Sequence, residues 1–270
     1  MKNTTLRVVG SLRRPATQNS GAGLLMTATL VPPLAAVARA DPNDRLSDYL
    51  DSLRFYLALP DTTVDRILFV DNSCGNLSPL VRLAQETPHA KEVEFIGFEG
   101  NDHPYQRGKA YGEFKLMDFG LANTTLFGSD DIVWKTTGRL KFLNLPQMSQ
   151  RSKSLDFDIL CDLHNVPWVG TGNWQTRHNM DLRVFAFRKK AYDTVFRDQW
   201  RAHESGFDAG FMYHLVLQKH LDVRVVPRFP VQAQLQGISG RHLRDYRSNS
   251  QSFKDSVRGA MRRNVPWLWL

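Results

Sequence analysis

The sequence has 270 residues, enough for one large α/β domain or two small ones with a sizeable core. Its 42% hydrophobic and 23% charged residues are typical of a globular protein, and no apolar run approaches the roughly 20 residues of a membrane span. The net charge of +8 lies at the ends, because residues 1–20 carry +4, residues 241–270 carry +5 and the rest carries −1. This distribution argues against a nucleic-acid-binding body and favours solvated tails or a contact with an anionic membrane.

The two cysteines, Cys74 and Cys161, have neither the spacing of metal ligands nor that of a disulfide framework. The sequence also begins without a secretory signal. Together these features predict a protein of the reducing cytoplasm.

Residues 1–20 are polar and basic without a clear period, and they predict a flexible basic arm. An apolar run of strand-forming residues follows over 24–32. Residues 43–59 predict a helix with Asn43 or Asp44 as its cap. Its expected apolar face consists of Leu46, Leu50, Leu53 and Leu57.

Strands and helices then alternate. Helices are expected over 77–86 and 108–124, and the second has Ala110, Phe114, Met117 and Leu121 on one face. Strands are expected over 65–73, 92–100 and 130–137. This alternation predicts right-handed crossovers and a mainly parallel sheet flanked by helices, an α/β fold of Rossmann-like type.

The second half is less regular. Residues 156–164 contain a strand, 182–196 a strand leading into a helix, 205–220 a helix, and 222–236 an extended segment with prolines typical of a sheet edge. Since we find no repeat and no low-complexity linker, we expect a single domain over 21–245. It divides into a nucleotide-binding half (21–145) and a smaller mixed acceptor half (146–245), and a basic and aromatic tail (246–270) follows.

In a mainly parallel sheet the ligand crevice lies at the carboxyl ends of the strands. The residues predicted there are Asp71, Asn72 and Ser73 after the second strand, residues 99–103 after the third, and residues 136–139 after the fourth.

The order of these motifs resembles the nucleotide-binding half of GT-A fold glycosyltransferases. The segment "DNS" (71–73) ends a strand, and "GKAYGE" (108–113) is similar to the Gly-Lys segment that opens the helix before their metal-binding strand. The later run from "RVFAFRKKAYDTVF" to "LDVRVVP" resembles their acceptor half. More narrowly, "WKTTGRLKFLNL" and "GISG" resemble transferases of bacterial surface-polysaccharide biosynthesis, such as those of O-antigen and capsule.

The resemblance implies that Asp71 and Asn72 contact the nucleotide of the donor, and that Lys109 contacts phosphate or a sugar hydroxyl at a helix N-terminus. The residues also allow simpler interpretations. Asp, Asn and Ser are common turn residues, and Lys109 could be a solvated lysine in a first helical turn.

Thr136-Thr137-Gly138-Arg139 occupies the position where the family's metal-binding carboxylates would stand. Because no Asp-x-Asp is present, we expect no divalent metal, and Lys135 and Arg139 would stabilise the leaving diphosphate. Gly138 would allow close approach of the backbone. Lys135, Thr137 and Arg139 share one face if the strand continues. A basic turn on the sheet rim is the alternative, and Asp156 with Asp158 is a rival metal site.

Transfer by direct displacement needs a carboxylate that deprotonates the acceptor hydroxyl. The resemblance places Glu204 there, with Asp181 and Asp208 as rivals. Arg241 and His242 follow "GISG", whose glycines would shape a loop over the diphosphate. Glu204 could instead be a carboxylate at a helix start, and a lone histidine such as His242 or His103 is commonly structural.

These features predict a glycosyltransferase that moves a sugar from a nucleotide sugar to a glycan or lipid-linked acceptor, without a cofactor or divalent metal. Its place would be the cytoplasm. A position at the inner face of the plasma membrane is also expected if the tail, which combines arginines with Trp267 and Trp269, contacts the membrane, and a tail packed on its own domain or on a partner is the alternative. The alternatives are a nucleotidyltransferase of similar fold, although the loop after the first strand is poor in glycine, and a catalytically inactive interaction module.

Overall fold

The computed structural model describes the chain apart from residues 1–2, 11–20, 34–37, 103–106, 166–177, 203–208, 219, 241–242, 244 and 266–270. Only the backbone is described for Lys109, Ala202, Ala209 and residues 249–254. Across the described ranges, no helix is both long and apolar enough to traverse a lipid bilayer.

The fold is built on one sheet of eight strands. The central strands β4, β3, β2 and β5 are parallel, whereas β1 and β10 run antiparallel to their neighbours β4 and β5. The predicted α/β fold with a mainly parallel sheet and a smaller mixed portion is therefore confirmed. In spatial order the strands are β1 (Thr4–Val9), β4 (Glu92–Gly97), β3 (Val64–Asp71), β2 (Ala22–Ala28), β5 (Ile132–Thr137), β10 (Val184–Arg188), β7 (Ile159–Leu160) and β11 (Val225–Val226).

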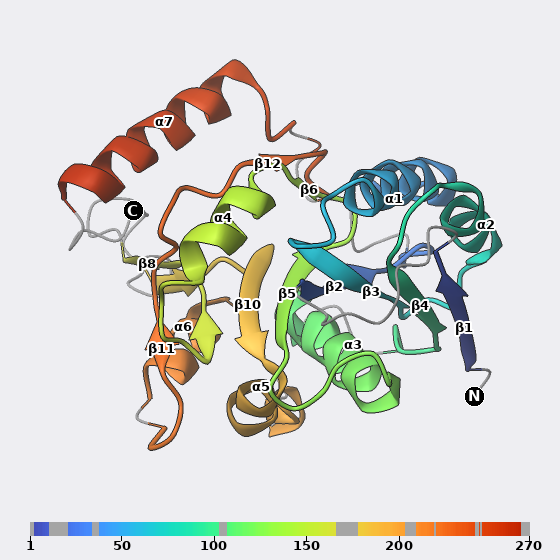
Figure 1. Ribbon diagram of the computed structural model, residues 1–270, viewed down its shortest axis with the longest axis horizontal. Helices are drawn as coiled ribbons and strands as arrows, with labels where there is room; N and C mark the ends of the chain where they lie inside the picture. The colour runs from blue at the N-terminus through green and yellow to red at the C-terminus, as the bar shows by residue number, and fades with distance from the viewer. Residues whose placement is uncertain are drawn as a thin grey trace.

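Helices cover both faces of the sheet (Figure 1). The alternation of side chains along β2 sends Leu24 and Met26 into one core cluster and Leu25 into the other. The first cluster contains residues of α1 (Pro42–Leu57), α2 (Ser78–Glu86) and α4 (Leu145–Ser152). The second contains residues of α3 (Lys109–Asn123), α5 (Lys189–Val195), the 3-10 helix Gln199–Ala202 and α6 (Ala209–Leu217).

Helix α1 begins earlier than the sequence predicts. Its N-cap is Asp41, whose carboxylate accepts hydrogen bonds from the backbone N–H of Asn43 and Asp44, and Pro42 occupies the first helical position. The prediction of Asn43 or Asp44 as the cap is therefore wrong. The buried face is also rotated from the predicted one, since Tyr49 and Tyr56 are buried while Leu46 and Leu50 pack only partly.

The prediction of a flexible arm over residues 1–20 is wrong for Thr4–Val9, because these residues form β1. This strand pairs with β4 over its whole length, from Thr4 opposite Gly97 to Val9 opposite Glu92. Val8 is its buried side chain. The strand escapes sequence analysis because an edge strand with one buried residue has almost no apolar periodicity.

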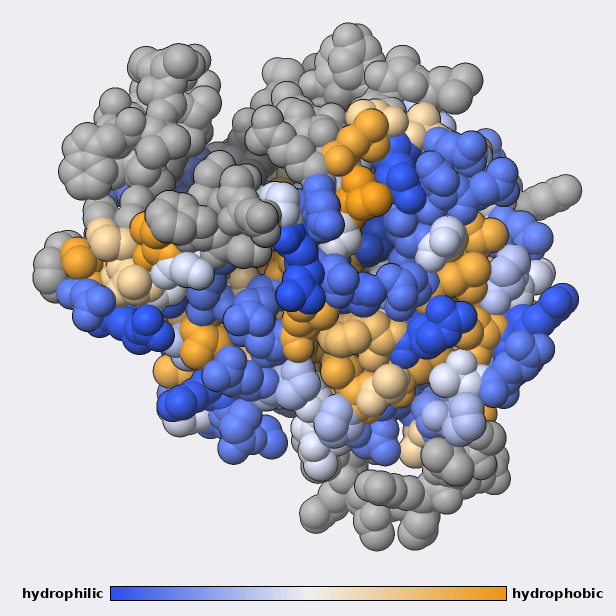
Figure 2. Space-filling view, turned by 90° about the horizontal axis from the view of Figure 1, so that it is seen from above, coloured by the Kyte–Doolittle hydropathy of each residue, from blue (hydrophilic) through white to orange (hydrophobic). Residues whose placement is uncertain are grey.

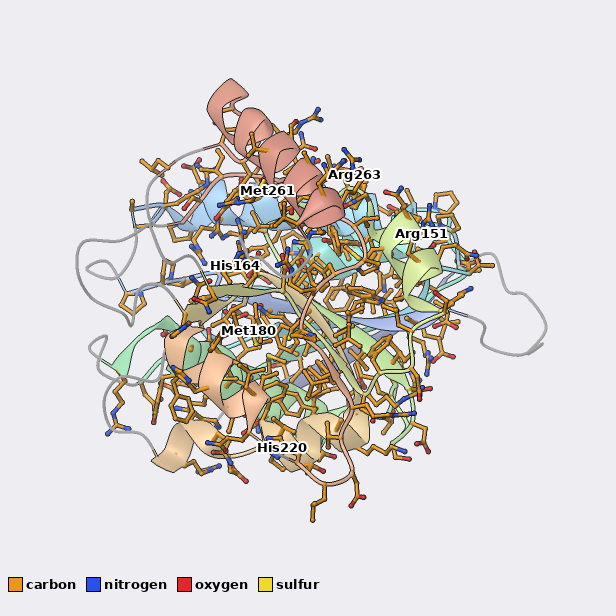
Figure 3. All side chains as sticks on the ribbon, turned by 90° about the vertical axis from the view of Figure 1, so that its left-hand side faces the viewer. Arg151, His164, Met180, His220, Met261 and Arg263 are labelled. Carbon is orange, nitrogen blue, oxygen red and sulfur yellow. The ribbon has the colours of Figure 1, made fainter. Side chains whose placement is uncertain are left out.

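The prediction of a C-terminal tail over residues 246–270 is wrong for residues 249–264. These residues form a helix, α7 (Asn249–Asn264). Arg262 near its end makes two hydrogen bonds, of 2.9 and 2.8 Å, to the buried carboxylate of Asp162. Figure 3 shows α7, with Met261 and Arg263, above His164 and Met180. These two residues belong to a small sheet of β8 (Leu163–Asn165) and β9 (His178–Met180), and a second small sheet pairs β6 (Lys141–Phe142) with β12 (Leu235–Gln236).

A shallow groove runs between α1 and α2 on the outer surface. Leu50 and Leu83 line it together with charged residues, among them Arg54 and Arg82. Viewed from above, the surface over these helices shows hydrophobic residues bordered by hydrophilic ones (Figure 2). None of these residues belongs to the predicted site.

Candidate functional site

The parallel strands change their winding direction between β2 and β5. After β2 the chain runs through α1 to β3 and through α2 to β4, and it then returns across the other face through α3 to β5, on the opposite side of β2. In open α/β sheets, ligands bind outside the carboxyl ends of the strands at such a switch point. The candidate site therefore lies where Ala28 ends β2 and Thr137 ends β5.

Asp71, predicted to contact the nucleotide, is fully buried and organises the neighbouring loops. Its carboxylate accepts hydrogen bonds from the backbone N–H of Leu30 (2.8 Å), Ser73 (3.1 Å) and Gly75 (2.9 Å), and from the Ser73 hydroxyl (2.8 Å). These donors occupy the lone pairs of both oxygens. The local structure therefore supports the turn-anchoring interpretation of "DNS" rather than a ligand contact.

Asn72 is also buried, and its partners belong to the loop after β2. Its side-chain oxygen accepts a hydrogen bond from the Thr29 hydroxyl at 2.7 Å, and its backbone N–H donates to the carbonyl of Ala28 at 3.2 Å. Asn72 thus ties the end of β3 to the end of β2 and to the loop that follows β2.

Lys135 is fully buried beneath the switch point, on the α3 side of β5. Its Nζ lies 2.5 Å from Oε1 of Glu113 on α3 and also donates to the carbonyl of Leu182. The same carboxylate oxygen accepts a hydrogen bond of 2.5 Å from the Thr27 hydroxyl. This ion pair fastens α3 to β2 and β5, and it leaves Lys135 inside the core rather than facing the crevice.

Arg139 lies on the opposite face, against α1. Its Nη1 donates to the carbonyl of Ile238 at 3.0 Å and stands 3.6 Å from the Asp48 carboxylate. The prediction that Lys135 and Arg139 share a face is therefore wrong, because β5 ends at Thr137 and the chain turns before Arg139. The Arg139 side chain is only 8% exposed, and its Nε has no hydrogen-bond partner among the described residues.

The backbones of Thr137 and Gly138 connect the turn after β5 to β2, to α1 and to the start of β10. The Gly138 N–H donates to the Thr27 carbonyl at 2.8 Å, and its own carbonyl accepts from the Ser52 hydroxyl. The close approach predicted at Gly138 thus exists, but toward β2 and α1. The Thr137 N–H donates to the Arg183 carbonyl at 2.9 Å, which brings the start of β10 to the carboxyl end of β5.

Sequence analysis missed a cluster of charged residues beside Arg139. Arg39, in the loop after β2, makes hydrogen bonds of 2.6 and 2.9 Å to Asp48. Buried Arg45 donates to the Thr29 carbonyl at 2.6 Å and to the Arg39 carbonyl at 3.2 Å, so it fixes the path of that loop. Burial, with the nearby charge of Arg139, lowers the pKa of Arg45. The only sign of this charged cluster in the sequence is the spacing of the charged residues at the start of α1.

The "GISG" segment (237–240) lies against the loop after β2. Its Gly240 carbonyl accepts hydrogen bonds from the backbone N–H of Ala38 at 3.0 Å and of Arg39 at 3.4 Å. Gly237 has a φ of 133°, a conformation that favours glycine, and a Cβ on Gly240 would stand 2.6 Å from Nη2 of Arg139. The two glycines therefore let this segment close over Arg139.

Asp181, the rival base, lies in the same region and is engaged by Arg183. The guanidinium binds it through two hydrogen bonds, of 2.8 and 2.6 Å, and the Arg183 backbone N–H adds a third of 3.0 Å. Burial acts to raise the pKa of Asp181, but the charge and hydrogen bonds of Arg183 outweigh it and lower the pKa to about 2. A carboxylate so stabilised in its charged form is a weak base.

Glu204, Asp208, His103, Arg241 and His242 lie outside the described residues, and Lys109 is described only by its backbone, which opens α3 as predicted. Within the described ranges, Asn72 follows β3, Arg139 follows β5, and the Asp181–Arg183 pair precedes β10, while Lys135 is buried within β5.

No group of three or more histidine, cysteine, aspartate or glutamate side chains suited to a metal ion occurs in the described part of the chain. The rival pair is occupied by arginines, since Asp158 accepts hydrogen bonds from Arg224 at 2.9 and 3.0 Å and lies 3.3 Å from Arg188. Asp156 forms an ion pair with Arg224 as well. These carboxylates stabilise the β7–β11 edge.

No family model matches the sequence, and a search of curated proteins finds no match either. Among solved structures, the chain is similar to a 4-diphosphocytidyl-2C-methyl-D-erythritol synthase from Anaerococcus prevotii, with 10% identity, a TM-score of 0.45, and coverage of 87% of this chain and 96% of that one. A second structure described as 4-diphosphocytidyl-2C-methyl-D-erythritol synthase shares 8% identity at a TM-score of 0.42, over 87% of this chain and 97% of that one. Such similarity concerns the course of the chain and implies no activity.

Proposed function

We propose that this chain is a transferase with a nucleotide-activated donor, and that it moves a sugar from a nucleotide sugar to a glycan or lipid-linked acceptor. One observation carries the proposal. At the switch point between β2 and β5, where α/β sheets bind their ligands, an arginine with an unpartnered Nε is held under a glycine-containing loop. The Nε is buried, so a phosphate oxygen would reach it only with the loop displaced, and a guanidinium with a free N–H suits such an oxygen.

The charges around Arg139 are close to balanced. The basic side chains of Arg39, Arg45 and Arg139 lie near three carboxylates, those of Asp41, Asp44 and Asp48. The contribution proposed here is therefore that of the Arg139 guanidinium itself. A leaving nucleoside diphosphate develops negative charge, and a fixed guanidinium at this place would stabilise it without a metal ion.

The acceptor hydroxyl needs a base, and we keep Glu204 in that role. Asp181 is less suited because its carboxylate is bound by Arg183 and its pKa is lowered to about 2. We assign Asp181 and Arg183 instead to the wall of the crevice beside β5.

Nucleotidyl transfer is the second candidate, and the basic loop after β2 favours it, because Arg39 and Arg45 flank the switch point where a triphosphate would lie. Two features count against it. Arg45 is buried and committed to backbone carbonyls, and the sequence has no glycine between Gly23 and Gly75, whereas a triphosphate-binding loop needs close approach of its backbone.

The two candidates differ in their products. We would incubate the purified chain with a panel of nucleotide sugars and measure release of the nucleoside phosphate, and in parallel with nucleoside triphosphates plus sugar 1-phosphates and measure release of pyrophosphate. We expect product in the first assay. Pyrophosphate release alone would establish nucleotidyl transfer, and no turnover or binding in either assay would favour an inactive interaction module.

Two comparisons then test the proposed phosphate contact. Arg139→Ala should weaken donor affinity by about 1.5–3 kcal/mol, the usual range for a hydrogen bond to a charged group, and Arg139→Lys should restore only part of it. The matched control is Arg151→Ala, on the exposed face of α4 (Figure 3). Equal donor affinities of the wild type and the three variants would remove Arg139 from the site. Activity that EDTA abolishes and Mn²⁺ restores would refute metal independence.

A further inference from the structure

The first strand of the chain, β1, forms one edge of the large sheet (Figure 1). It pairs with β4 on one side, and no element of the described chain pairs with it on the other. All of its six residues except Val8 are exposed. An edge of this kind presents a row of backbone N–H and C=O groups that a further strand can pair with.

The pairing of β1 with β4 determines which of these backbone groups are free. The Gly10 N–H donates to the Lys91 carbonyl at 3.0 Å, and this pair continues the register of the two strands. In an antiparallel ladder, hydrogen-bonded pairs alternate with pairs that are not hydrogen-bonded, so every second residue of β1 turns its backbone groups away from β4. The residues of β1 with outward backbone groups are Thr5, Arg7 and Val9.

The side chains of β1 leave this edge open. Exposed edges are commonly guarded by a charge or a proline, and β1 contains no proline. Its one charged residue, Arg7, is directed back onto its own chain, where Nη2 lies 2.7 Å from the Glu92 carboxylate on β4 and Nη1 lies 3.5 Å from the Thr125 hydroxyl. Leu6, on the same face of the strand as buried Val8, is 41% exposed. The edge thus combines free backbone groups with an exposed apolar side chain.

The sequence of β1 is complementary to itself when two copies run antiparallel about a two-fold axis at Leu6. Thr5 of each copy then lies opposite the partner's Arg7, and these two pairs can form two backbone hydrogen bonds each. The two Leu6 side chains meet at the axis as a pair without hydrogen bonds, the arrangement in which side chains lie closest. A register centred on Arg7 would place like charges opposite each other, and one centred on Val8 would place a side chain at the axis that is already buried.

We propose that the chain forms a symmetric dimer in which β1 pairs with β1 of a second copy, so that the two eight-stranded sheets become one continuous sheet. The inference goes beyond the proposed function and does not depend on it. Strands β4 and β3 separate β1 from the switch point between β2 and β5, so pairing at this edge leaves both candidate sites uncovered.

Sedimentation equilibrium of the full chain at increasing concentration tests the proposal, and we expect a monomer–dimer equilibrium. Thr5→Pro removes an outward N–H and leaves the backbone groups that face β4 intact. Leu6→Lys places two positive charges at the axis. Each variant should raise the dissociation constant of the dimer at least tenfold. The matched control is Leu217→Lys on α6, a leucine of similar exposure at 44%, which should dimerise like the wild type.

A disulfide tests the register directly. In Leu6→Cys the two introduced cysteines would have their Cα atoms about 4.5 Å apart, within the range of a disulfide, so oxidation should yield a covalent dimer. The wild type, with its exposed Cys74, is the control for cross-linking elsewhere. A wild type that stays monomeric at every concentration, a dimer equally stable in Thr5→Pro and Leu6→Lys, or no cross-link above the wild-type level would overturn the proposal. Circular dichroism shows whether the variants are folded, and if Thr5→Pro is not, Leu6→Lys and the cross-link decide.

Discussion

Crowding around Gly138 explains why the turn after β5 has a glycine at this position. A Cβ there would stand 2.8 Å from the Thr27 carbonyl and 3.2 Å from the Tyr49 ring, both parts of a packed core. We therefore expect Gly138→Ala to destabilise the fold by about 1–3 kcal/mol, the usual cost of overpacking. Gly128→Ala is the control, since its Cβ would be 3.6 Å from Asp131, an ordinary contact. Urea midpoints measure both, and equal midpoints would contradict the crowding at Gly138.

Asp181 predicts a pH dependence whose sign follows from its lowered pKa. The folded value of about 2 lies below the unfolded value of about 3.9, so the unfolded state takes up the proton first as the pH falls. The stabilisation, on the order of 2 kcal/mol, is complete above about pH 5 and disappears between about pH 4 and 2. Unfolding free energies should therefore fall more steeply with acid in the wild type than in Asp181→Asn. Parallel curves would show that Arg183 does not stabilise the charged carboxylate.

The packing of helix α7 on the rest of the protein depends on one buried ion pair. The Arg262 and Asp162 side chains are 8% and 3% exposed, and removal of one partner leaves the other charge buried. Arg262→Ala should cost about 3 kcal/mol, at the lower end for buried pairs because Arg228 lies 3.5 Å from the same carboxylate. Exposed Arg263→Ala should stay within about 0.5 kcal/mol. Hydrogen exchange of α7 should accelerate in the first variant alone, and slow exchange in both would refute the anchor.

The elements also show how far a sequence can be interpreted. The helix over 108–124 was predictable because Ala110, Phe114, Met117 and Leu121 are all buried on one face. Strand β1 was not, since its stability comes from pairing with β4 and little from its own side chains. The carboxyl-edge rule predicted that Asn72 and Arg139 follow the ends of strands, and they lie just after β3 and β5. It could not separate Lys135 from Arg139, because the end of a strand within one or two residues decides which face a side chain takes.

The two halves of the chain, residues 21–145 and 146–245, share one sheet. Strand β10 of the second half pairs with β5 along five residues, from Val184 opposite Thr136 to Arg188 opposite Ile132. Phe185 and Phe187 of β10 belong to the same core cluster as Phe114 of α3, so the core on that face crosses the boundary near residue 145. A core continuous across the boundary predicts that neither half is an independent folding unit.

We therefore expect the full chain to unfold in a single cooperative transition. Calorimetry and circular dichroism should give the same midpoint, with calorimetric and van't Hoff enthalpies in agreement. A fragment ending at residue 145 should not fold, because it would leave β5 as an unpaired edge and expose the apolar face of α3. Adding the remaining residues as a separate chain should restore structure if the halves recognise each other through β5 and β10. Two resolved transitions in the full chain, or a folded fragment 1–145, would show instead that the first half is a domain in its own right.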